Sequence, residues 1–234
     1  MPFAPIAIVG RSCVLPGALD PSALWELVAA GRDVVGEAPE GRWGLEKSEV
    51  LRDPRGPAPD GAWSDRGGYV SGFEAVWDPA GFGVGEGELE GLDPLAHWVL
   101  HTAREALRDA GDGRVGSVER PRTGAVFGNL GFPSEGMAAF ARSVWTEDAR
   151  VGVDPRNRFM SGGTAALLSR ALGLGAGAFC LDAACASSLY AIKLACDRLH
   201  DGEADVMLAG AVQRADDLFL PVGFTALGAL SRSG

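Results

Sequence analysis

The sequence lacks the residue patterns that would indicate metal or disulfide chemistry. Its four cysteines include no CxxC pair, so neither a zinc knuckle nor a disulfide scaffold is indicated. Of its three histidines, His97 and His101 are one helical turn apart, but no third ligand accompanies them. We therefore expect a reduced protein with no bound metal and no bound cofactor.

Long apolar runs and clusters of basic residues are also missing. No apolar run approaches the length of a membrane-spanning helix, and residues 1–5 lack the basic start of a signal peptide. The chain has 21 Lys and Arg against 31 Asp and Glu, a formal net charge of −10. That balance argues against a nucleic-acid backbone or an anionic membrane as a partner. These absences predict a cytoplasmic protein.

The composition itself is that of a globular protein. The 234 residues are 47% hydrophobic and 22% charged, and this length suffices for one large domain or two small ones. Residues 33–91 are rich in glycine, proline and charge, which predicts a loop-rich excursion rather than a second domain. Scattered aromatic residues, such as Trp43 and Trp77, are expected to pack this excursion against the rest of the protein. We treat residues 1–234 as one region.

Short buried strands alternate with helices along the rest of the chain. This alternation predicts an α/β fold with a mainly parallel sheet. Asp20-Pro21 and Asp93-Pro94 are strong helix-start signals. The predicted strands are residues 6–9, 124–128, 178–181 and 205–211. The predicted helices are residues 21–31, 94–111, 137–145, 164–172 and the run that follows Cys185, with a further short apolar segment at 224–230.

Cys185 stands where an apolar strand-like run meets a helix-like run. A cysteine that opens a helix meets unpaired backbone N–H groups and the helix dipole, which favour the reactive thiolate. Its small neighbours, Ala183, Ala184, Ala186 and Ser187, leave room for an electrophile. The position predicts a nucleophile. The alternative is the ordinary role of a cysteine that only fills space.

Residues 182–189 read D-A-A-C-A-S-S-L, which resembles the D-T-A-C-S-S-S-L active-site signature of β-ketoacyl synthases in modular polyketide synthases. Other blocks of the chain resemble the same family and keep its order. They are residues 6–10 with the Pro-Gly turn at 16–17, 92–94 with 105–111 (like MDP…EALEDAG), 122–128 (like RTGVFVG), 205–210 and 230–231.

The resemblance implies a thiolase-like fold of αβαβα layers, of which this chain supplies mainly the first αβα half. It implies that Cys185 accepts an acyl group from a thioester on the phosphopantetheine of an acyl carrier protein. The Cys185 N–H would be one oxyanion donor. The acyl group then condenses with a malonyl-type extender, with loss of CO₂, in polyketide or fatty-acid biosynthesis. A homodimer, or pairing with a complementary ketosynthase half, is also implied.

The family's catalytic histidines and supporting lysine lie in motifs that would follow residue 234. His97, His101 and His200 match none of those motifs, and we assign none of them to catalysis. We therefore expect the chain alone to be inactive in condensation. Residues 127–133, F-G-N-L-G-F-P, and 97–101 suggest a branch like polyunsaturated-fatty-acid or glycolipid synthases.

Two other functions stay open. A non-catalytic half-domain could act as an interaction or dimerisation module through the strand at residues 178–181. A cysteine hydrolase would need a histidine partner for Cys185. A half-fold also leaves apolar surface uncovered, which predicts a poorly soluble or self-associating chain.

Overall fold

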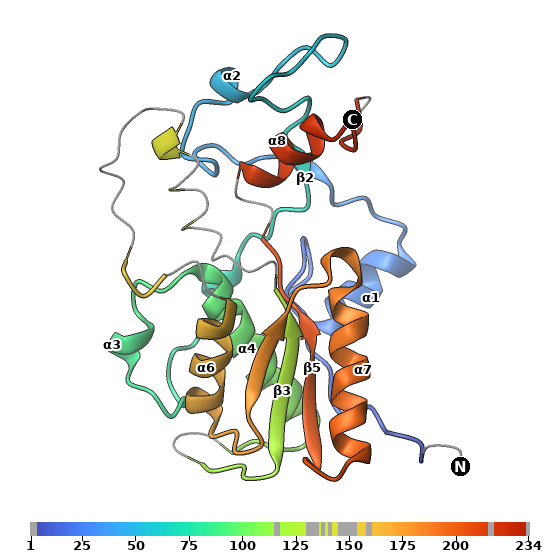
Figure 1. Ribbon diagram of the computed structural model, residues 1–234, viewed down its shortest axis with the longest axis vertical. Coiled ribbons are helices and arrows are strands. Elements are labelled where there is room, and N and C mark those ends of the chain that lie inside the picture. The colour runs from blue at the N-terminus through green and yellow to red at the C-terminus, as the bar shows by residue number, and fades with distance from the viewer. Residues whose placement is uncertain are drawn as a thin grey trace. The chain divides into compact units, whose positions relative to one another are not determined.

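Three parallel strands form the sheet that carries Cys185 in the computed structural model (Figure 1). β3 (Thr123–Gly128) lies in the centre, between β4 (Ala178–Leu181) and β5 (Val206–Ala211). Phe127 of β3 is paired with Cys180 on one side and with Gly210 on the other. All three strands were predicted from the sequence, and the parallel arrangement confirms the expected α/β fold.

The structure describes residues 4–114, 118–129, 136, 139, 142–144, 154–157, 161–214 and 218–232. The chain folds as two units. The sheet unit comprises Met1–Val14, Phe73–Pro133 and Arg158–Gln213, and the loop unit comprises Leu15–Gly72, Ser134–Asn157 and Arg214–Gly234. Among the described residues, no helix combines the length and apolar composition that a membrane crossing needs.

Helices cover both faces of the sheet. α6 (Ser161–Leu172) and α4 (Pro94–Asp109) pack together on one face, and α7 (Ser187–His200) packs on β3 and β5 from the other (Figure 1). Ala125 and Phe127 of β3 lie in the core cluster beneath α4 and α6. Since side chains alternate along a strand, Gly124 and Gly128 face α7. The sheet unit is therefore an αβα sandwich.

The helix starts follow the predicted caps. The Asp93 carboxylate accepts a hydrogen bond from the Leu95 N–H at 2.8 Å, and Pro94 occupies the first turn of α4. Asp20 caps α1 (Pro21–Ala29) in the same way, through the N–H groups of Ser22 and Ala23. The predictions of both helices are confirmed.

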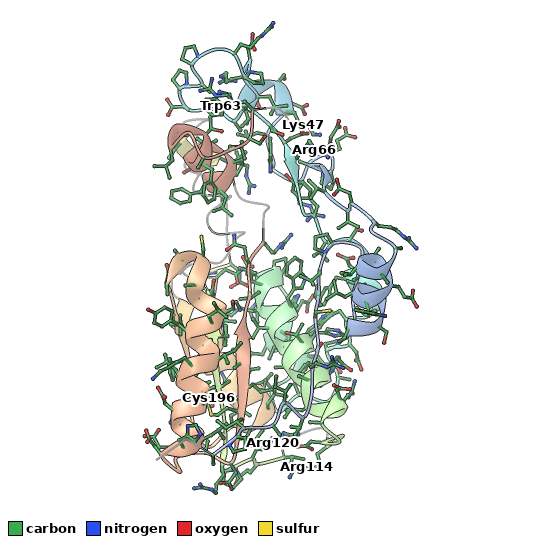
Figure 2. All side chains as sticks on the ribbon, turned by 90° about the vertical axis from the view of Figure 1, so that its right-hand side faces the viewer. Lys47, Trp63, Arg66, Arg114, Arg120 and Cys196 are labelled. Atoms are coloured by element: carbon green, nitrogen blue, oxygen red, sulfur yellow. The ribbon has the colours of Figure 1, made fainter. Side chains whose placement is uncertain are left out.

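A buried arginine fixes the entrance to β3. The Arg120 guanidinium, whose side chain is 3% exposed, contacts the Asp112 carboxylate at 2.9 Å. It also donates to the carbonyl oxygens of Leu172 at 2.7 Å and Arg114 at 3.0 Å. Figure 2 shows Arg114 and Arg120 at the same end of this unit. Arg120, just before β3, is thus bonded both to the segment that follows α4 and to the end of α6.

Two predictions about strands are wrong. Residues 6–9 form no strand, and Ile8 is 85% exposed, although the run is apolar and β-branched. A strand requires a neighbour for its backbone hydrogen bonds, and no described strand pairs with this segment. β5 was predicted to be buried, yet its six residues are exposed or only partly buried. It has one described neighbour, so it is an edge of the described sheet.

The loop unit contains little regular structure. β1 (Gly36–Glu37) pairs antiparallel with β2 (Arg66–Gly67), and α2 (Lys47–Val50) and α8 (Phe219–Ala226) are short. Its core consists of Ala38, Trp43, Val50, Ala62 and Leu218. Figure 2 labels Lys47, Trp63 and Arg66 in this unit.

The stretch predicted to be loop-rich, residues 33–91, contains little regular structure. Its last part, in the sheet unit, adds only η1 (Phe73–Ala75) and α3 (Glu86–Leu89). The helix predicted at 137–145 lies largely outside the described residues. The apolar segment predicted at 224–230 overlaps the end of α8.

Candidate active site

Cys185 lies on the turn that leads from the carboxyl end of β4 into α7. Residues 184–186 form the short helix η2 (Ala184–Ala186), and α7 follows immediately. Cys185 is exposed, whereas Cys13, Cys180 and Cys196 are partly buried. The predicted strand-to-helix placement is therefore confirmed, and its role as a nucleophile stays a prediction.

The residue before the cysteine has a left-handed backbone. Ala184 has a φ of 50°, a conformation that costs an L-residue with a Cβ about 1–2 kcal/mol. Such strain persists only when surrounding interactions hold it, and it occurs preferentially at functional sites. The turn at Ala184 places Cys185 between the end of the strand and the first turn of α7.

Two side chains hold this turn. The Asp182 carboxylate accepts a hydrogen bond from the Ala184 N–H at 2.9 Å. The Ser187 hydroxyl accepts from the Ala183 N–H at 3.0 Å and donates to the Ala184 carbonyl oxygen at 2.7 Å. The backbone on both sides of the Ala184 α-carbon is therefore fixed by side-chain hydrogen bonds.

The backbone N–H of Cys185 precedes the first donors of the helical turn. The Ala186 N–H donates to the Ala183 carbonyl oxygen at 3.1 Å, and the Ser187 N–H donates to that of Ala184. Early amides of a helix have no acceptor within it and favour a negatively charged group. The Cys185 N–H lies at this end of the helical turn, and its role as an oxyanion donor stays a prediction.

The carboxyl ends of β3, β4 and β5 lie next to the turn and are joined by backbone hydrogen bonds. The Asn129 N–H donates to the Leu181 carbonyl oxygen, and the Val212 N–H donates to that of Gly128, both at 2.9 Å. A Cβ added to Gly128 would lie 2.4 Å from the Cβ of Ser187. Gly128 therefore allows the first residue of α7 to approach the sheet closely.

Cys180 has a different environment on the preceding strand. Its side chain packs against the core cluster beneath α4 and α6, and burial raises the pKa of its thiol to about 12. The thiol is protonated at neutral pH and is a poor nucleophile. Cys196 lies on α7 and is partly buried (Figure 2).

His200 is far from Cys185, which lies on η2 just before α7 begins. His200 is the last of the 14 residues of α7, a helix about 21 Å long at a rise of 1.5 Å per residue. Its Nε2 lies 2.9 Å from the Ala4 carbonyl oxygen.

The other two histidines are held on α4. The Nε2 of His97 lies 2.9 Å from the Leu89 carbonyl oxygen, and the ring stacks on Trp77. His101 is 5% exposed, lies edge-on to Phe73, and has its pKa lowered by burial. In the described part of the chain, no hydrogen bond or ion pair joins a histidine to Cys185. Nor does any group of three potential metal ligands gather there.

The first turns of α7 expose apolar side chains that none of the described residues covers. Leu189, Tyr190 and Ile192 are 70%, 56% and 49% exposed, whereas Ala191 and Ala195 are buried against the sheet. An amphipathic surface helix normally places polar residues on its outer face. The uncovered apolar surface that the sequence predicts is therefore present directly after Cys185.

These features define an αβα protein with an exposed cysteine on a strained turn at the carboxyl edge of a parallel sheet. The model of the β-ketoacyl synthase N-terminal domain matches residues 4–234. The chain belongs to this family.

Its relatives include large synthases. It is 36% identical over 232 residues to a mycocerosic acid synthase-like polyketide synthase of Mycolicibacterium smegmatis, covering 99% of this chain and 10% of the relative. It is 35% identical over 213 residues to the mycoketide-CoA synthase of Mycobacterium tuberculosis, covering 89% and 5%. The chain thus spans about a tenth or less of the length of these relatives.

Solved structures confirm the thiolase-like fold. The PfaC keto synthase–chain length factor superposes with a TM-score of 0.81 at 32% identity, covering 95% of this chain and 26% of that one. An oxazolomycin ketosynthase domain of Streptomyces albus JA3453 gives 0.72 at 26% identity, covering 97% and 38%. Both are ketosynthases, as the resemblance in the sequence predicts.

Sequence reasoning found Cys185 but missed the residues that hold its turn. An aspartate two residues before a strained position is typical of an Asx-turn, so Asp182 carried a usable signal. Ser187 was noted only for its small size, whereas in the structure its hydroxyl makes two hydrogen bonds. The left-handed Ala184 had no signal, because glycine or asparagine is the usual residue there.

Proposed function

We propose that this chain is the nucleophile-bearing part of a β-ketoacyl synthase in polyketide or fatty-acid biosynthesis. The observation that carries the proposal is Cys185, exposed on a strained strand-to-helix turn in a chain of this family. The substrates are acyl and malonyl-type thioesters on the phosphopantetheine arm of an acyl carrier protein. Among the branches of this family, we favour one like the polyunsaturated-fatty-acid or glycolipid synthases.

In the proposed first step, the Cys185 thiolate attacks the thioester carbonyl carbon and forms a new C–S bond. The carbonyl electron pair moves onto oxygen, and the Cys185 N–H stabilises this oxyanion. When the intermediate collapses, the bond to the phosphopantetheine sulfur breaks and that thiolate leaves with a proton from solvent. The acyl group is then held on Cys185 as a thioester.

The proposed second step joins the acyl group to a malonyl-type extender with loss of CO₂. Such a step needs groups that stabilise the enolate formed on decarboxylation. His200 lies at the far end of α7, and His97 and His101 are engaged on α4. We therefore propose that the 234-residue chain loads an acyl group without condensing it.

A non-catalytic interaction module is the second candidate. Its support is the exposed apolar side chains in the first turns of α7 and the place of β4 at an edge of the described sheet. In that case Cys185 would have no acyl-transfer role. The chain would instead pair with a second copy or with a complementary ketosynthase half. The cysteine hydrolase has no support, because no described histidine contacts Cys185.

The test separates loading from condensation. The full chain and a Cys185→Ala variant are incubated with an acyl N-acetylcysteamine thioester, and intact mass is measured. A gain of one acyl group in the wild type alone supports the proposal. Malonyl thioester is then added, and CO₂ release is followed. No acyl gain in either protein would favour the interaction module, whereas CO₂ release above background would contradict loading without condensation.

A further inference from the structure

We propose that Ser187 is a positioning residue for Cys185, whose hydroxyl holds the left-handed turn at Ala184 and thereby sets the reactivity of the cysteine. This inference deepens the proposed role of Cys185 and rests on it. Ser187 touches neither the thiol nor a substrate in this account. It acts through the backbone that presents both the sulfur and the Cys185 N–H.

One hydroxyl engages the backbone on both sides of the strained residue. Oγ accepts from the Ala183 N–H, which precedes the Ala184 α-carbon, and donates to the Ala184 carbonyl oxygen, which follows it. The distances, 3.0 and 2.7 Å, are those of well-formed hydrogen bonds. Together with the Asp182 carboxylate, the hydroxyl opposes relaxation of Ala184 toward a right-handed conformation.

Packing limits the freedom of Ser187 itself. Ser187 is 8% exposed, and its Cβ lies over Gly128 of the central strand. Any residue larger than glycine at position 128 would collide with this Cβ. The side chain of Ser187 is therefore packed against the sheet rather than exposed to solvent. Movement of Ala183 and Ala184 relative to Ser187 would require breaking both hydrogen bonds of the hydroxyl.

The turn determines where Cys185 lies because a rotation about the backbone of Ala184 moves every atom of the following residue. If Ala184 relaxes, the sulfur and the Cys185 N–H leave their places at the start of the helical turn. The rate of thioester attack is sensitive to such displacements, since attack requires a defined approach geometry. Ser187 thus controls a geometry that Cys185 cannot maintain alone.

A merely structural role for Ser187 makes a different prediction. A hydroxyl that only stabilises α7 would lower the melting temperature without changing the chemistry of folded protein. The positioning role predicts changed reactivity of Cys185 in folded protein, and repair by a second substitution that removes the strain. Ala184→Gly supplies this repair, because glycine adopts positive φ without cost.

The experiment compares the full chain with Ser187→Ala, Ala184→Gly, the double variant, and Ser188→Ala as the matched control. Each folded protein is treated briefly with iodoacetamide at pH 7, and peptide mass spectrometry gives the alkylation rate at Cys185. Cys180, which is partly buried and has a raised thiol pKa, reports unfolding in the same sample. Acylation by an acyl N-acetylcysteamine thioester is measured in parallel.

We expect Ser187→Ala to slow alkylation of Cys185 severalfold and acylation about tenfold, the effect of losing a hydrogen-bonded constraint. Ala184→Gly in that background should restore both rates to within about threefold of the wild type, because it relieves the strain. Ser188→Ala should leave both within about twofold, since it changes no bond of the turn. Unchanged alkylation in Ser187→Ala, or no repair by Ala184→Gly, would overturn the inference.

The two readouts keep this inference separate from the proposed function. A wild-type chain that is alkylated but never acylated would contradict the proposed function, while the alkylation rates would still decide the role of Ser187. Conversely, acylation that is the same in the wild type and in Ser187→Ala would support the function and refute the positioning role.

Discussion

Gly128 lies so close to Ser187 that a Cβ added to the glycine would be 2.4 Å from the Cβ of the serine. Gly128 belongs to the central strand β3, and Ser187 is the first residue of α7, so the strand and the helix are in close contact at this point. Real Cβ atoms do not come this near to one another, so α7 would have to shift away from the sheet.

We expect Gly128→Ala to lower the free energy of unfolding by about 3 kcal/mol, because overpacking here has no flexible side chain to displace. Gly210→Ala, on β5, is the matched control, since no atom of the described residues lies within 4 Å of a Cβ built there. It should change stability by about 0.5 kcal/mol or less. Urea denaturation of both variants checks the prediction, and equal losses would contradict it.

Arg120 should matter far more than its neighbour Arg114. Both contact the Asp112 carboxylate, but the Arg120 side chain is 3% exposed and that of Arg114 is 56% exposed. Arg120→Met should cost about 3–5 kcal/mol because it leaves buried carbonyl groups and the carboxylate without their partner. Arg114→Met should cost about 1 kcal/mol or less. A comparable loss in the two variants on chemical denaturation would refute this ranking.

Acid should weaken the fold through Asp112. Hydrogen bonds from Arg114 and Arg120 hold the pKa of its carboxyl well below the ordinary value, against an opposing effect of burial. A carboxyl with a lowered folded pKa contributes stability above its unfolded pKa and loses it as pH falls toward the folded value. We expect stability to decline below about pH 4. The decline should be shallower in Asp112→Asn, as measured by denaturation between pH 5 and pH 2.

His101 should make the fold sensitive to mild acid. Burial lowers its pKa; Arg104 and Arg108 act in the same direction, and Glu105 opposes them. The unfolded chain then binds the proton more readily, so stability falls as pH drops below about 6.5. Its buried Nδ1 has no hydrogen-bond partner among the described residues, so His101→Leu removes a titrating group without breaking a bond at that atom. Between pH 7.5 and 5.5, the melting temperature should fall less with decreasing pH in this variant than in the wild type. An equal pH dependence in both proteins would disprove the assignment.

The exposed apolar side chains in the first turns of α7 should drive association of the 234-residue chain. Leu189→Lys together with Ile192→Lys should shift sedimentation toward the monomer, because it places charge among these side chains. Asp201→Lys, at the exposed end of the same helix, is the control for added positive charge. Association that persists equally in all three proteins would place the interface elsewhere.

The elements that sequence patterns predicted well are those whose signals are local. Asp93 and Pro94 fix the start of α4 by themselves, and the apolar run of β4 ends where Asp182 begins the turn. Cys185 could be placed because it lies between two such elements. Local chemistry therefore sufficed for the position of the candidate nucleophile.

The features that escaped prediction depend on residues distant in the sequence or on conformations that their residue type does not announce. Arg120 bonds the carbonyl oxygen of Leu172, 52 residues away. Residues 6–9 have the composition of a strand but no described partner to pair with, and pairing is a property of the fold. Ala184 adopts a left-handed backbone because Asp182 and Ser187 hold it there, not because it is alanine.

The most direct test of the account is to locate the acyl group after reaction with an acyl thioester. The full chain is incubated with the acyl N-acetylcysteamine thioester, digested, and mapped by tandem mass spectrometry across all four cysteine peptides. The account predicts the acyl group on Cys185, with Cys180 unmodified because burial raises the pKa of its thiol to about 12. Acylation of Cys180 or Cys196 while Cys185 stays free would contradict it.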